Sequence, residues 1–138
     1  MALKITLKPH EKMILGGAVI VNGVSKCEFV VENKVSILRQ NNIMLPQDAD
    51  SPAKRIYLAV QLMYVDPSQM DAHQKLYWRL VKEFVDAAPS SLGLVDQISE
   101  CIFKESFYEA LKLTKHLIEF EQEVIERVTK CSEILPVG

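Results

Sequence analysis

The chain has 138 residues, 49% of them hydrophobic, and a formal net charge of −2, which excludes a disordered tail and predicts one packed domain or two small interlocked ones. Its three cysteines, Cys27, Cys101 and Cys131, lie far apart without metal-ligand spacing, so neither a disulfide framework nor a zinc site is indicated and a reducing cytoplasm fits best. The longest apolar run, residues 13–21, is too short to span a bilayer and is interrupted by Gly16-Gly17. We therefore expect a soluble, cytoplasmic protein that is not exported and does not contact a membrane.

The charge is unevenly distributed along the chain. Residues 1–55 carry eight Lys or Arg against five Asp or Glu, whereas residues 56–138 carry eight against thirteen. A basic first part can meet phosphate groups, and an acidic second part is repelled by nucleic acid. The alternative interpretation is that both parts are ordinary solvated surfaces.

Residues 1–44 predict an antiparallel β unit. Leu3, Ile5 and Leu7 alternate with polar residues, which is typical of a half-buried strand. Asn22-Gly23 predicts a tight hairpin turn with positive φ at both residues, and Asn33-Lys34 predicts another turn. The five predicted strands are residues 3–7, 12–15, 18–21, 24–32 and 35–39.

Residues 51–133 predict a helical region with four helices. Ser51 and Pro52 suit the N-cap and first position of a helix that is apolar on nearly every side except at Gln61. Pro67 opens the second helix, and Ser90 or Ser91 is expected to cap the third. The fourth is expected to begin with a capping box of Ser106 and Glu109 and to run to about residue 130.

The last helix is predicted to carry an apolar stripe that continues inward through Ile125 and Val128. Its outer face is expected to be acidic, with Glu119, Glu121, Glu123 and Glu126. The fold class is therefore α+β, with a small antiparallel five-stranded β unit followed by a four-helix C-terminal region, and one cooperative domain is expected. Because a β unit of this size buries little surface alone, either these helices or a second copy in a homo-oligomer must cover it.

No set of catalytic residues stands out. His10, His73 and His116 are far apart, and no serine sits in a nucleophile-elbow pattern. Gly16-Gly17 lacks the lysine and the helix of a phosphate-binding loop and predicts a plain turn. We expect no enzyme, no metal and no cofactor.

The stretch from Asp50 to Tyr64, DSPAKRIYLAVQLMY, closely resembles the FlbT family of flagellin-synthesis regulators. The resemblance covers nearly the whole chain and includes residues 3–9, 18–23, 85–90 and 107–112. It implies a post-transcriptional regulator that binds the 5′ leader of flagellin mRNA and represses translation or message stability, although some members act positively. The competing hypothesis is a helical protein-binding module that holds flagellin or another flagellar regulator and affects RNA only indirectly.

Residues 7–16 and 35–43 are also similar to the first turn and last strand of the CsrA family of RNA-binding repressors. That resemblance places the last-strand arginine of the family on Arg39 and its first-strand arginine pair on Leu7 and Lys8. A dimer formed by strand exchange is one route to a homo-oligomer. The residues predicted to contact RNA phosphates are Lys8, Lys12, Arg39, Lys54 and Arg55.

Lys54 and Arg55 sit in the first turn of their helix, where the helix dipole disfavours cations, and this placement indicates a use for their charge. The local alternative is that their stems pack on the core while their heads pair with Asp48 or Asp50. Recognition would rest on charge and arginine hydrogen bonds, because Phe29 is the only aromatic residue of the β region and is expected in the core.

Overall fold

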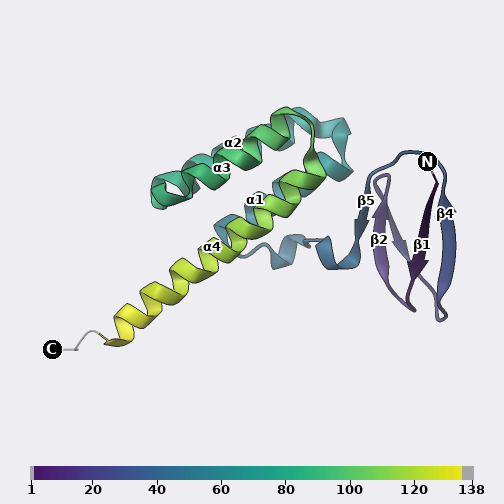
Figure 1. Ribbon diagram of the computed structural model, residues 1–138, viewed down its shortest axis with the longest axis horizontal. Coiled ribbons are helices and arrows are strands. Elements are labelled where there is room, and N and C mark those ends of the chain that lie inside the picture. Colours follow the sequence, from purple (N-terminus) through teal and green to yellow (C-terminus); the bar gives the residue numbers. More distant parts are fainter. Residues whose placement is uncertain (1, 135–138) are drawn as a thin grey trace.

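A computed structural model describes residues 2–134 and shows an α+β protein (Figure 1), as predicted. All strand pairings are antiparallel, and the four helices follow the strands. The strands are β1 (Leu3–Leu7), β2 (Lys12–Leu15), β3 (Ala18–Val21), β4 (Cys27–Val31) and β5 (Ile37–Arg39). The helices are α1 (Pro52–Val65), α2 (Met70–Ala87), α3 (Leu92–Phe103) and α4 (Phe107–Ile134), with short 3₁₀ turns at Gln40–Asn42, Pro46–Asp48, Pro67–Gln69 and Pro89–Ser91.

The strands form two small sheets. β1 pairs with β4 in one, and the order in the other is β3-β2-β5. The β2–β3 hairpin turns at Gly16 and Gly17, whose φ values of 58° and 88° are the positive values that a two-residue type I′ turn requires. A Cβ on Gly17 would also lie 3.1 Å from the carbonyl oxygen of Val65, so the turn packs closely on the end of α1.

The predicted hairpin at Asn22-Gly23 is wrong, because β3 and β4 belong to different sheets. Asn22 instead fixes the loop through its side-chain amide, which donates to the carbonyl oxygens of Lys8 at 2.8 Å and Ser25 at 3.0 Å. Asn33-Lys34 joins strands that are likewise unpaired, since β5 pairs with β2. β4 and β5 are also shorter at their N-terminal ends than predicted.

The protein has three layers, with the β3-β2-β5 sheet between the β1-β4 sheet and the helices (Figure 1). Met13 of β2 packs with Ile5 and Leu7 of β1 between the two sheets. Its neighbour Ile14 and Leu38 of β5 point the other way and join the helical core. β2 and β5 of the middle sheet are therefore covered on both faces, which explains why Leu38 is fully buried, while β3 at its edge stays largely exposed.

One face of α1 holds β5 and the segment that connects the sheets to the helices. The Tyr64 hydroxyl accepts from the backbone N–H of Ile37 and donates to its carbonyl, both at 3.1 Å. The Gln61 amide pairs in the same way with Met44, at 2.7 and 3.0 Å. Gln61, the one polar residue of the predicted buried helix, thus satisfies two part-buried backbone groups of Met44.

The N-terminal caps of the helices match the predicted caps only in part. Ser51 caps α1 as predicted, accepting from the N–H of Lys54 at 3.4 Å. Ser91 precedes α3, but its hydroxyl donates backward to the carbonyl of Ala88 at 2.7 Å and caps nothing. Glu109 pairs with Lys112 at 3.4 Å, a contact that differs from the predicted capping box.

The predicted faces of α4 need two corrections. Glu121 is 9% exposed and points inward, where its Oε2 accepts from the N–H of Ala53 at 2.9 Å. Ile125 and Val128, predicted to be inward, are 48% and 61% exposed. The reason is that the C-terminal part of α4 projects beyond the helices on which α4 packs (Figure 1), so no helix covers the apolar side chains there.

Candidate functional site

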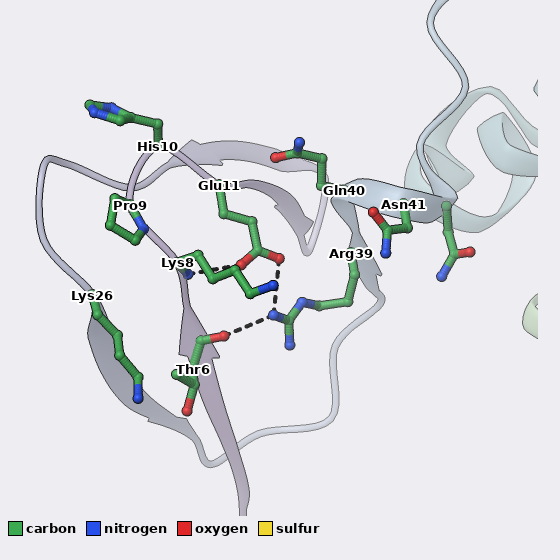
Figure 2. Close-up of a pocket in the computed structure, with 10 residues that line it drawn as sticks. Thr6, Lys8, Pro9, His10, Glu11, Lys26, Arg39, Gln40 and Asn41 are labelled. Carbon is green, nitrogen blue, oxygen red and sulfur yellow. Dashed lines mark hydrogen bonds and ion pairs between the residues drawn. The ribbon is translucent and has the colours of Figure 1, made fainter.

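A broad depression of about 910 Å³ lies where the β1–β2 loop meets β5 and the following 3₁₀ turn (Figure 2). It contains three cations, Lys8, Lys26 and Arg39, against one carboxylate, Glu11. Two of the five predicted RNA-binding residues, Lys8 and Arg39, are therefore brought together from segments 31 positions apart. We call this site the β-unit depression, and its lining residues are Thr6, Lys8, Pro9, His10, Glu11, Lys26, Arg39, Gln40, Asn41 and Asn42.

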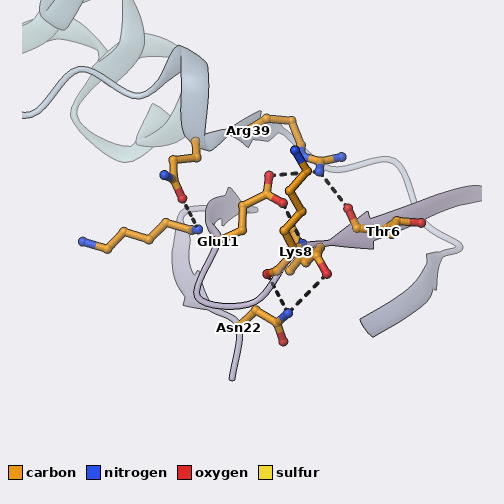
Figure 3. Close-up of polar contacts among 8 residues, drawn as sticks. Thr6, Lys8, Glu11, Asn22 and Arg39 are labelled. Atoms are coloured by element: carbon orange, nitrogen blue, oxygen red, sulfur yellow. Dashed lines mark hydrogen bonds and ion pairs between the residues drawn. The ribbon is translucent and has the colours of Figure 1, made fainter. Parts of the chain in front are cut away.

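The β1–β2 loop is held in one conformation by local hydrogen bonds (Figure 3). His10 adopts a φ of 62°, a left-handed value that histidine accepts more readily than most side chains. Glu11 Oε1 accepts from the backbone N–H of Lys8 at 2.9 Å, while the Asn22 amide binds the Lys8 carbonyl from the other side. The backbone beneath Lys8 is thus fixed, although the Lys8 side chain is exposed.

Arg39 connects the two sheets. Its Nη2 donates to Glu11 Oε2 at 3.0 Å and to the carbonyl oxygen of Thr6 on β1 at 2.8 Å. The Arg39 side chain nevertheless keeps 42% of its surface exposed. The guanidinium is therefore anchored through Nη2, and its Nε is buried without a hydrogen-bond partner among the described residues. The exposed remainder of the side chain is the part that can meet an incoming phosphate.

Glu11 tunes the charge of this site. The N–H of Lys8 and then the guanidinium of Arg39 hold the pKa of its carboxyl below the ordinary value. Glu11 consequently stays ionised at neutral pH and partly offsets the charge of Arg39. Lys8 and Lys26 then supply the remaining positive charge of the depression.

The other three predicted contact residues lie outside the β-unit depression. Lys12 donates its backbone N–H to Gln40 Oε1 at 2.6 Å, and its exposed side chain does not line the site. Lys54 pairs with Asp50 at 3.2 Å, which is the contact that the local alternative predicted. Arg55 is exposed beside it. Lys54 precedes Tyr64, which binds β5, by ten helical positions, or about 15 Å along α1.

Lys26 is the residue that sequence reasoning missed at this site. It immediately precedes β4, whose burial alternates as predicted, with Cys27, Phe29 and Val31 facing the core. The only indication of this role in the sequence was the position of Lys26 on the polar side of the predicted strand. A single exposed lysine there does not differ from an ordinary solvated one, so only the fold shows that it lines the same depression as Lys8 and Arg39.

The histidines serve different parts of the molecule. His73 is largely buried on α2, and its Nε2 lies 3.2 Å from Asp66 Oδ2. The pKa of Asp66 is lowered, mainly by the hydrogen bond that the Ser68 hydroxyl donates to it and secondly by this contact with His73. His116 lies on α4, 3.6 Å from Glu119. In the described part of the chain, no group of His, Cys, Asp and Glu is placed to hold a metal ion, and none of the helices is both long and apolar enough to cross a membrane.

Comparisons with known proteins agree on one family. The family model described as "Flagellar protein FlbT" matches residues 3–125. A Bradyrhizobium diazoefficiens protein named a probable flagellum biosynthesis repressor, FlbT 1, is 41% identical over 90% of this chain and 85% of its own length. A Caulobacter vibrioides protein named flagellum biosynthesis repressor protein FlbT is 36% identical over 94% of this chain and 93% of its own. No solved structure matches the chain.

Proposed function

The chain belongs to the FlbT family of flagellar proteins, and from this we propose that it regulates flagellin synthesis after transcription by binding the 5′ leader of a flagellin mRNA. Its relatives are named repressors of flagellum biosynthesis, which supports a regulator, and we propose that the chain acts by binding without catalysis. A regulator that acts on mRNA works in the cytoplasm. We propose that binding represses flagellin synthesis, because the relatives are named repressors.

The observation that supports RNA binding is the convergence of Lys8, Lys26 and Arg39 on the β-unit depression. Arginine offers a planar fork of donors that matches phosphate oxygens, and lysines act as mobile point charges around it. The depression is open and broad, as a flexible RNA strand requires. Occupancy of the leader by the protein would lower its translation or its stability.

Three phosphate contacts predict a measurable dependence on salt. Each contact to a single strand contributes about −0.7 to the slope of log affinity against log salt, so three give a slope of about −2. A fourfold rise in salt then weakens binding by roughly 20-fold. Lys12, Lys54 and Arg55 stay predicted contacts, and each that touches RNA would steepen the slope further.

The test is an electrophoretic mobility shift of a flagellin leader RNA by the purified protein, run at low and physiological salt beside an unrelated RNA. Replacing Lys8 and Lys26 by Gln should weaken binding and reduce the slope by about 1.4. The matched control replaces Lys82 and Lys104, which are exposed and outside this depression, with the same loss of charge. A wild-type protein that does not shift the leader would overturn the proposal.

A second candidate function, binding a flagellar protein, is favoured by the exposed apolar side chains of Ile125 and Val128 at the projecting end of α4. These residues continue the spacing of the buried stripe, so they suit an amphipathic partner helix. Flagellin is the partner to test. Retention of the protein on immobilised flagellin, lost when both residues become Ser while leader RNA still binds, would favour this function over the first.

A further inference from the structure

A second, smaller depression of about 270 Å³ lies between the sheets and α4 and adjoins the β-unit depression through Asn42, which lines both. We call it the seam pocket. Its apolar floor comes from Leu38 of β5 and Leu111 of α4, two residues of the shared core. The residues around it are Leu38, Asn42, Tyr57, Tyr108, Leu111, Lys112 and Lys115.

The walls of the seam pocket carry cations and aromatic rings. Lys115 binds the side-chain oxygen of Asn42 through its ammonium group, so α4 is tied to the 3₁₀ turn after β5. Lys112 lies 5.0 Å from the centre of the Tyr108 ring. Tyr57 donates to the carbonyl of Asn42 at 2.5 Å, and burial raises its pKa to about 12, so this hydroxyl keeps its proton.

We propose that the seam pocket binds one nucleotide of single-stranded RNA, with its base on Tyr108 and its flanking phosphates at Lys112 and Lys115. This inference rests on the proposed RNA-binding function and extends it to a second element of the fold. At about 270 Å³ the pocket is smaller than the roughly 300–1,000 Å³ of sites for drug-sized ligands, and a single base suits it. Its apolar floor, aromatic wall and two ammonium groups match the flat face and the negative charge of a nucleotide.

Tyr108 is available for stacking. It keeps 40% of its surface exposed, and its ring is tilted by 49° against Tyr64 at a centroid distance of 5.9 Å. The ammonium of Lys112 shares the ring and also lies 3.4 Å from Glu109 on the exposed surface. Both of these contacts of Lys112 are weak in water, so a stacked base can displace the ammonium onto an adjacent phosphate.

The acidity of the second half of the chain lies mostly away from this site. Glu119, Glu123 and Glu126 lie further along α4, and Glu126 follows Lys112 by fourteen helical positions, or about 21 Å. That distance exceeds the Debye length of about 8 Å at physiological salt, whereas Glu119 follows Lys115 by only four positions, or about 6 Å, and Glu109 pairs with Lys112, so these two carboxylates offset part of the local charge. The sequence average therefore hides a basic first part of α4 that lies beside the β-unit depression, and one RNA strand can cross Asn42 to occupy both.

The test measures binding of two fluorescent probes by anisotropy across a salt series, a ten-nucleotide oligoadenylate and an RNA duplex of the same length. Tyr108→Leu should weaken binding of the single strand about 10-fold or more, whereas Tyr108→Phe, which keeps the ring, should bind like the wild type. The double variant Lys112→Gln with Lys115→Gln should reduce the salt slope by about 1.4, unlike the matched Lys82→Gln with Lys104→Gln control. A circular-dichroism melt verifies that each variant is folded at the assay temperature.

The outcomes separate the inference from the function on which it rests. If the wild type binds neither the oligoadenylate nor a flagellin leader, the proposed function and the inference both fail. If the wild type binds and the Tyr108→Leu and double-lysine variants bind with unchanged affinity and slope, the seam pocket is no RNA site while the proposed function stands. Equal affinity for single strand and duplex would also overturn the inference, because the bases of a duplex cannot stack on Tyr108.

Discussion

Replacing Glu121 by Ala should destabilise the protein by about 2–3 kcal/mol, because this buried carboxylate serves the start of another helix. The first turn of α1 contains no acidic residue and carries Lys54 and Arg55. Glu121 supplies the missing negative charge from α4 by accepting the N–H of Ala53. Its removal leaves a buried N–H without a partner, at a cost of about 1–3 kcal/mol, and the absence of its charge from the helix dipole adds to that cost.

The expected change in melting temperature follows from the size of the chain. Unfolding entropy of about 2.1 cal/mol/K per residue over 138 residues gives roughly 3.4 °C for each kcal/mol, so Glu121→Ala should melt about 7–10 °C below the wild type. Glu121→Gln keeps an acceptor but loses the charge and should cost only about 1 kcal/mol. Thermal unfolding followed by circular dichroism measures both.

Glu126→Ala is the matched control, since Glu126 lies on the same helix and is exposed. A surface change of this kind should stay within about 0.5 kcal/mol. The reasoning is refuted if Glu121→Ala and Glu126→Ala melt at the same temperature. An order in which Gln is worse than Ala would also contradict it, because the hydrogen bond to Ala53 would then contribute nothing.

Further predictions concern the β unit and its junction with the helices. Because the pKa of Glu11 is lowered in the folded protein, Glu11 stabilises the fold above the ordinary glutamate pKa of about 4.3, and this stabilisation is lost as pH falls through the folded pKa. In urea denaturation between pH 3 and 7, Glu11→Gln should therefore reduce the loss of stability at acid pH. An unchanged dependence of stability on pH would contradict this. Leu38→Ala should lower the free energy of unfolding by about 2–5 kcal/mol. The circular-dichroism signals of strands and helices should still be lost in one transition on unfolding, whereas two separate transitions would show that the layers unfold independently. Replacing Lys54 and Arg55 by Gln should leave the melting temperature unchanged or raise it, because both cations oppose the helix dipole. The same change should reduce the slope of log RNA affinity against log salt by about 0.7 for each phosphate that these side chains bind in the wild type. A lower melting temperature with unchanged affinity of the folded protein would remove both residues from the RNA site.

The sequence predicts elements well here because each depends on neighbours along the chain. Alternation marks β1 and β4, and Ser51-Pro52 marks the start of α1. Pairing is different, since Asn22-Gly23 carries a local hairpin signal while the partner of β4 is the distant β1. An alternating strand specifies a buried face and not the strand beside it, so the tertiary arrangement decided the outcome.

The candidate site shows the same limit. Lys8 and Arg39 were predicted from their charge in the basic half of the chain, and the fold brings them together. Lys112 and Lys115 were missed because they belong to the half of the chain whose net charge is negative, and the fold places them beside the β unit. Glu121 was misplaced because it sits in a run of glutamates, and helical position alone turns it inward.

The shared middle sheet has a consequence for the newly made protein. Asn42 and Lys115, which meet at the seam pocket, are 73 residues apart in the chain. At about 5–20 residues per second, the ribosome needs roughly 4–15 s after Asn42 to add the lysine that binds it. During that interval the nascent strands leave Ile14 and Leu38 without their helical cover. A nascent chain that still lacks α4 therefore lacks one side of the seam pocket, so the proposed binding of one RNA strand along both depressions requires α4 to have been made.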